Sequence, residues 1–181
     1  MKNNIFLKLL SFLILLITAC KHDMQQISIP PTDVEFIDDF YNQTIDASKI
    51  NMYEATRLND SGVLAYALGN NIVMRESFDY LANPLRFRHI FVHELMHVWQ
   101  YQHFKFNVGA GDDYEYYLFE HESFFDYGRE EQADIMESFF RVSFINGVPK
   151  HTCLDCDKYD SDTILERYTD LYMEVITYNN L

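Results

Sequence analysis

The sequence predicts an α+β domain that is mostly helical, with a small β-hairpin or sheet beside a buried central helix. Apolar residues recur at the spacing of amphipathic helices in four segments of the chain. A strand–turn–strand pattern separates the first of these segments from the second, although its alternation is weak. About 150 residues remain after residue 32, which is enough for one domain with one core.

The first two predicted elements are a helix and a hairpin. Between residues 33 and 58, the apolar spacing indicates a helix with Thr32 or Asp33 as its N-cap. Two short apolar runs, 63–68 and 72–74, then flank a Gly-Asn-Asn turn, which is typical of a β-hairpin.

The central helix has the clearest start signal in the chain. Asn83 supplies a favoured N-cap residue and Pro84 a favoured first helical residue. The helical pattern runs to about His103. Apolar residues on several sides of this helix predict that it is buried; they are Ile90, Val92, Leu95, Met96, Val98 and Trp99.

Two more helices complete the predicted domain. One runs from Gly128 to about Ile145, where Asn146-Gly147 ends it, and the last starts near Ser161. Residues 105–127 are less regular. They contain a glycine-rich loop at 109–113, followed by a stretch that fits either a short helix or an extended segment.

Residues 1–19 have the composition of an export signal. Two lysines precede an apolar stretch that is too short for a confident bilayer span. The small residues directly before Cys20 resemble the lipobox of bacterial lipoproteins. That resemblance implies cleavage before Cys20 and lipid on its sulfur, which would anchor the protein to a membrane of the bacterial cell envelope, outside the cytoplasm. An uncleaved N-terminal membrane helix is the alternative.

The predicted organisation is a signal peptide (1–19), a lipidated tether (20–32) and one folded domain (33–181). The chain has 14 basic and 28 acidic residues for a net charge of −14, and loss of the two leader lysines makes it −16. This charge argues against nucleic acid as a partner and against a domain lying flat on anionic lipid. It agrees with attachment through lipid alone.

The other two cysteines, Cys153 and Cys156, form a Cys-x-x-Cys pattern near the C-terminal end. In an exported protein this spacing favours a short-loop disulfide. Free thiols, a redox pair and a second metal site with His151 are the alternatives.

Residues 93–97 read His-Glu-Leu-Met-His, an HExxH motif within the predicted central helix. His93 and His97 project from one helical face and can share one zinc ion. Glu94 lies beside that position, where it can accept a proton from water that the metal activates. One short segment thus offers two metal ligands and a general base.

Glu130 is the predicted third ligand. It opens a Glu-x-x-x-Asp pattern on the following helix, which places Glu130 and Asp134 on one face. A carboxylate from this helix would complete a His-His-Glu set and leave a fourth position open. Asp134 could then accept a hydrogen bond from a ligand histidine and fix its tautomer.

Several other residues are weaker candidates. His103 has the spacing of the third histidine in HExxHxxGxxH, but Gln100 stands where that pattern needs glycine to end the helix. His89 lies one turn before the motif and is either a surface residue or a supporting group. Three residues are candidates to stabilise an oxyanion, namely His121, Tyr127 and Arg129.

Three segments carry a family resemblance. Residues 91–102 resemble the HELxHVWQ motif of bacterial zincin-like metallopeptidases of the gluzincin kind. Residues 130–134 (EEQAD) are similar to the EQQAE or EAEAD segment of that family, and residues 68–72 (LGNNI) to its LGNTI strand. The resemblance spans residues 63–140 and leaves out the leader and the Cys-x-x-Cys segment.

The resemblance implies a minimal zincin fold that holds one Zn²⁺ ion and hydrolyses peptide bonds in a peptide or protein substrate. It implies an edge strand near Asn71–Arg75 that pairs with the extended substrate. A non-catalytic zinc-stabilised envelope lipoprotein that acts as a binding module is the main alternative, because so small a domain has little room for a deep cleft. A helical lipoprotein without metal is the third hypothesis.

Overall fold

The computed structural model describes residues 23–58, 62–105, 113–145 and 147–178, and it confirms an α+β fold that is mostly helical. The predicted signal peptide, Cys20 and the glycine-rich loop at 109–111 lie outside the described residues. Within the described part of the chain, none of the helices has both the length and the apolar character needed to cross a membrane.

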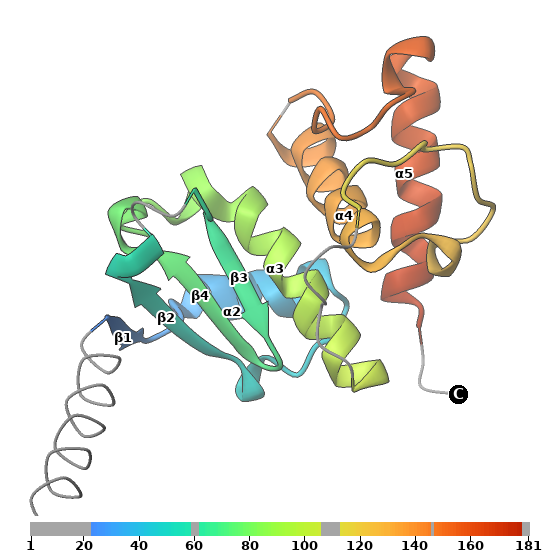
Figure 1. Ribbon diagram of the computed structural model, residues 1–181. Coiled ribbons are helices and arrows are strands. Elements are labelled where there is room, and N and C mark those ends of the chain that lie inside the picture. The colour runs from blue at the N-terminus through green and yellow to red at the C-terminus, as the bar shows by residue number, and fades with distance from the viewer. Residues whose placement is uncertain (1–22, 59–61, 106–112, 146, 179–181) are drawn as a thin grey trace, which may run out of the picture.

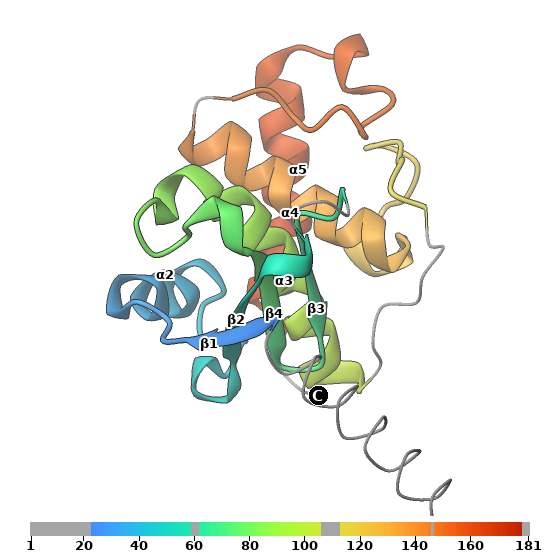
Figure 2. The same ribbon diagram turned by 60° about the vertical axis from the view of Figure 1, so that its left-hand side comes forward.

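Helix α3 (Pro84–Phe104) lies at the centre of the molecule, between a four-stranded sheet and a pair of helices, α4 (Arg129–Phe144) and α5 (Ser161–Ile176) (Figure 1; Figure 2). Asn83 and Pro84 start α3 as predicted, although the Asn83 side chain makes no capping hydrogen bond. Every residue from Ile90 to Gln100 is buried, because the sheet covers one side of α3 and α4 covers another. The HExxH motif therefore lies in the interior.

The sheet has the order β1-β2-β4-β3. Strand β2 runs parallel to β4, and the other two pairings are antiparallel. The prediction that residues 71–75 form the edge strand is wrong, because β4 is paired on both sides and the edges are β1 and β3. The strands span Met24–Ile27 (β1), Asn51–Ala55 (β2), Ala65–Leu68 (β3) and Asn71–Arg75 (β4).

Strand β4 is buried on both faces, which explains the weak alternation in the sequence. Ile72 and Met74 belong to the main core, whereas Val73 packs with Ala55 and Leu58 on the other face of the sheet. A strand covered on both faces reads as a continuous apolar run rather than as an alternating one.

The predicted hairpin is formed by β3 and β4, and its turn is fitted to α3. Gly69 has φ 64°, a conformation that glycine adopts without steric strain. A Cβ atom at this position would lie 3.4 Å from Cζ of Tyr101 on α3. The turn thus brings β3 against the helix that carries the motif.

The N-terminal boundary of the domain was predicted too late. Strand β1 pairs with β2, and helix α2 (Pro31–Phe40) begins before the predicted caps, so residues 24–31 belong to the fold and not to a tether. Asp33 is not an N-cap. It is fully buried in the first turn of α2, where its carboxylate accepts hydrogen bonds from the Tyr80 hydroxyl (3.0 Å) and from Arg88. A buried carboxylate needs such partners to offset its lost hydration.

Candidate metal centre

His93, His97 and Glu130 converge where α3 and α4 meet. The two histidine Nε2 atoms lie 3.3 Å apart. Glu130 Oε2 lies 3.3 Å from Nε2 of His93 and 3.2 Å from Nε2 of His97. Ligand atoms bound to tetrahedral zinc at about 2.0–2.1 Å lie about 3.3 Å from one another. The three atoms therefore have the spacing of one face of a zinc tetrahedron, and all three residues are buried.

A chain of hydrogen bonds fixes the tautomer of His97. Gln132 donates from Nε2 to the carbonyl of Tyr127 (2.9 Å), so its Oε1 accepts from Gln100 Nε2 (2.9 Å). Gln100 Nε2 also donates to the carbonyl of Arg129 (3.0 Å), which directs its Oε1 toward His97 Nδ1 (3.0 Å). Since an amide oxygen can only accept, the proton of neutral His97 is on Nδ1 and the lone pair on Nε2 faces the other ligands.

His93 has two carboxylates facing its Nδ1 atom, the ring nitrogen that corresponds to the protonated one in His97. Its Nδ1 lies 2.8 Å from Asp134 Oδ1 and 3.6 Å from Glu137 Oε2. The contact with Asp134 is short but not well aligned for a hydrogen bond, so we describe it as an electrostatic contact. Two negative oxygens beside Nδ1 favour a proton there and leave Nε2 to bind a cation. Both histidines thus offer the nitrogen that a shared metal needs.

Glu94 is buried at this site without a partner for part of its carboxylate. Among the described residues, Glu94 Oε2 has no hydrogen-bond partner although no solvent reaches it. Burial raises the pKa of Glu94, and the nearby charges of His93 and His97 oppose that rise only in part. Such an orphaned oxygen is rare inside proteins and calls for a ligand or water. The residues present therefore fit a metal site, and Glu94 Oε2 is placed to accept a hydrogen bond from a further ligand or a water.

The ligand carboxylate is ionised in the metal-free protein. Burial alone would raise the pKa of Glu130, but the His93 and His97 rings outweigh burial when they carry a proton on Nε2, and they lower the pKa to about 2. Burial would likewise lower the pKa of His93, yet its contacts with Asp134, Glu130 and Glu137 raise it well above the usual value. A bound proton and a bound metal compete for such a ring, so metal binding would release protons.

The weaker candidates lie in other environments. His103 Nε2 contacts the carbonyl of Thr44 at 2.8 Å, and its ring packs on Trp99, because α3 continues past Gln100 and turns His103 away. The Tyr127 hydroxyl donates to the carbonyl of Leu118 (2.7 Å), while the Tyr127 ring contacts His121. That hydroxyl is therefore directed to loop carbonyls and not to the metal ligands.

Arg129 and His89 lie closer to the site. The carbonyl of Arg129 accepts from Gln100, so this residue takes part through its backbone. His89 Nδ1 lies 2.8 Å from Glu137 Oε1, which makes it a supporting group and not a ligand of the His93 cluster.

Sequence reasoning missed two residues at the site. The ring of Tyr114 stacks beside His93 with centroids 6.3 Å apart, and half of the tyrosine is exposed. Its pKa is raised by partial burial and then by the charge of Glu130. No local pattern marks Tyr114, whereas Glu137 follows Glu130 and Asp134 at i, i+4, i+7 spacing and could have been found on that helical face.

Cys153 and Cys156 form a disulfide, with their Cα atoms 5.6 Å apart. Their sulfurs are therefore not available as thiolate ligands, and the Cys-x-x-Cys segment is not a second metal site in this state. Comparisons of the chain with protein-family models, curated proteins and solved structures gave no match.

Proposed function

We propose that this protein is a zinc metallopeptidase with a minimal zincin-like fold, anchored to a membrane of the bacterial envelope through lipid on Cys20. One observation carries the proposal: three buried ligand atoms from α3 and α4 lie 3.2–3.3 Å apart, beside a buried Glu94 oxygen that has no hydrogen-bond partner in the described part of the chain. The anchoring part depends on the sequence before residue 21 alone.

Each residue of the site has a distinct task in peptide hydrolysis. His93 and His97 through Nε2, and Glu130 through a carboxylate oxygen, would hold zinc, which supplies a Lewis acid that can bring the pKa of water to about 7. Glu94 accepts the proton of the attacking water and passes it to the leaving amine. The raised pKa of Glu94 suits a group that must both take and release a proton near neutral pH. We assign the oxyanion contact to the hydroxyl of Tyr114.

The substrate is an extended peptide that adds to the edge of the sheet. Strand β4 is covered by β2 and β3, which leaves β3 as the edge strand packed against α3. Main-chain hydrogen bonds to an edge strand bind peptides with little demand on their sequence. Leu68, at the end of β3, is 55% exposed and offers an apolar contact beside this edge.

The purified full chain tests the proposal through Glu94→Gln. Metal content per chain and hydrolysis of a peptide library are measured for the wild type, for Glu94→Gln and for Glu166→Gln, which removes an exposed acid on α5. We expect one zinc per chain in all three proteins. Hydrolysis should fall about 10²–10⁴-fold in Glu94→Gln alone, because general acid–base catalysis is lost.

The outcomes separate the competing functions. Peptidase activity that survives Glu94→Gln would remove the catalytic role of this residue. A wild type that holds zinc and cuts no peptide would favour the non-catalytic binding module. A wild type without zinc would leave the metal-free helical lipoprotein as the better description.

A further inference from the structure

Lys150 lies on the Nδ1 side of His93 and contacts the same two carboxylate oxygens as His93 does. Its Nζ is 2.6 Å from Asp134 Oδ1 and 3.0 Å from Glu137 Oε2. These two oxygens are the ones that face His93 Nδ1. The ammonium group and the imidazole therefore share two carboxylate oxygens, with the lysine side chain only 23% exposed.

This arrangement makes Lys150 important for the position of both carboxylates. Asp134 is fully buried, and among the described residues its Oδ2 has no hydrogen-bond partner, so its contacts run through Oδ1. Glu130, Asp134 and Glu137 lie on one face of α4 and repel one another. Without the ammonium group, only the His93 ring would lie between Asp134 and Glu137, and we expect the two carboxylates to move apart. His93 would then lose the electrostatic contacts that orient its ring.

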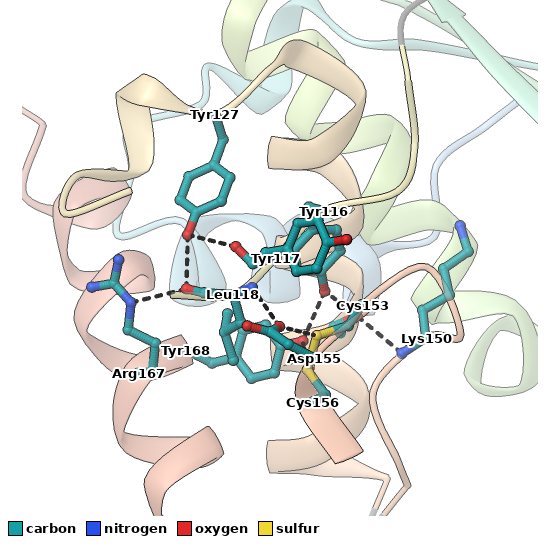
Figure 3. Close-up of a disulfide and its surroundings, with 11 residues drawn as sticks. Tyr116, Tyr117, Leu118, Tyr127, Lys150, Cys153, Asp155, Cys156, Arg167 and Tyr168 are labelled. Atoms are coloured by element: carbon teal, nitrogen blue, oxygen red, sulfur yellow. Dashed lines mark hydrogen bonds between the residues drawn. A yellow bond between two sulfur atoms is a disulfide. The ribbon is translucent and has the colours of Figure 1, made fainter. Parts of the chain in front are cut away.

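The segment that leads into the Cys153–Cys156 disulfide places Lys150. Its backbone N–H donates to Ser138 Oγ on α4 (3.1 Å), and its carbonyl accepts from Cys153 N–H (3.1 Å). Two backbone hydrogen bonds join the following residues to Tyr116. The Tyr116 N–H donates to the carbonyl of Thr152, and the Leu154 N–H donates to the carbonyl of Tyr116. Figure 3 shows Tyr116 and Lys150 in the surroundings of the disulfide.

We propose that Lys150 is a positioning residue for the metal site and that the adjoining segment held by the Cys153–Cys156 disulfide keeps it in place. The proposal rests on the proposed zinc site. Lys150 clamps Asp134 and Glu137, these orient His93, and the oriented His93 binds zinc more tightly. Groups that orient a metal ligand change metal affinity about 10–100-fold when removed.

Zinc affinity of the full chain tests this chain of contacts, measured by competition with a chromophoric chelator at fixed pH. We expect Lys150→Met to bind zinc about tenfold more weakly than the wild type. Lys150→Arg, which keeps the cation, should recover most of that loss. Lys49→Met is the matched control, because Lys49 is exposed and pairs with Asp46 (2.7 Å) at the surface. Urea unfolding of the metal-free forms reports any general loss of stability separately.

The disulfide provides the second arm. Cys153→Ser with Cys156→Ser should weaken zinc binding in the same direction, and should add little in the Lys150→Met background, since both act through one contact. Equal zinc affinities of Lys150→Met, Lys49→Met and the wild type would overturn the positioning role alone. If Lys150→Met does not fold, an unchanged affinity of the double cysteine variant overturns it instead. A wild type that binds no zinc overturns the proposed function, and this inference with it.

Discussion

The two sides of His93 differ in how their buried carboxylates are partnered. On the Nδ1 side of the His93 ring, Glu137 contacts Lys150 (3.0 Å) and His89 (2.8 Å). Glu94 follows His93 on α3 and is as buried as Glu137. Among the described residues, however, Glu94 Oε2 has no hydrogen-bond partner. Burial raises the pKa of Glu94, whereas for Glu137 the contacts with His89, His93 and Lys150 outweigh burial and lower the pKa well below its usual value.

Under the proposed function, this difference separates the carboxylate that supports a ligand from the carboxylate that reacts. Desolvation acts on both glutamates in the same direction, so the cationic partners decide the sign of each pKa shift. A paired carboxylate keeps its charge and its position, which suits the support of a ligand histidine. An unpaired buried carboxylate is a poor structural element but a ready proton acceptor.

The largest expected effect is loss of the metal itself. His97→Ala removes one of three ligands, and a third of a typical structural zinc binding free energy is about 4 kcal/mol, or about 1000-fold in affinity. Chelator competition measures it. His103→Ala is the control on the same helix, and it should keep zinc, since His103 contacts the Thr44 carbonyl instead. Equal losses in the two variants would show that His103 is the ligand or that both act through the fold.

Next in size is the effect of Tyr114→Phe on turnover. Removing one donor to an oxyanion lowers kcat about 10²-fold or more, because the donor acts on charge that develops only in the transition state. Zinc affinity should not change, since the ring beside His93 remains. Steady-state kinetics with the best library peptide measures kcat and KM. A change confined to KM would assign Tyr114 to substrate binding.

Much of the fold and the metal centre follows from patterns that are local in the sequence. The start of α3 depends on two adjacent residues, Asn83 and Pro84, and the hairpin depends on two short runs around one turn. Glu130 was identified because a ligand on the next helix is the simplest partner for His93 and His97. Such signals need no knowledge of long-range pairing.

The features that the sequence did not predict share a physical cause, because each depends on contacts with residues far away in the chain. Strand β1 has only two apolar residues and becomes a strand because β2, about 27 residues later, pairs with it. Asp33 looks like a helix cap until Arg88 and Tyr80 bury it. Tyr114 and Lys150 reach the site from irregular segments, whose course local propensity does not determine.

Glu137→Gln tests the partnered side of the comparison in the metal-free protein. Hydrogen bonds to charged partners contribute about 2 kcal/mol, so the free energy of unfolding at pH 7 should fall by about that amount. The folded pKa of Glu137 is depressed, so its ionised form contributes stability above the unfolded value of about 4.3 and loses it as pH falls toward the folded value. Urea unfolding of both proteins in EDTA at pH 7 and pH 3 measures this. A difference that grows in acid would contradict the assigned pairing.

Glu94→Gln should have the smallest effect on stability and the opposite sign. The folded pKa of Glu94 is raised, so at pH 7 its ionised form opposes folding, and this penalty vanishes as pH falls below the unfolded value of about 4.3. The metal-free variant should therefore unfold at a free energy about 1 kcal/mol higher than the wild type at pH 7, because a neutral amide is easier to bury than an unpaired carboxylate. Glu166→Gln on exposed surface should stay within about 0.5 kcal/mol of the wild type. Lower stability of Glu94→Gln would mean that Glu94 has a structural partner. Its carboxylate would then no longer differ from that of Glu137 in being unpaired.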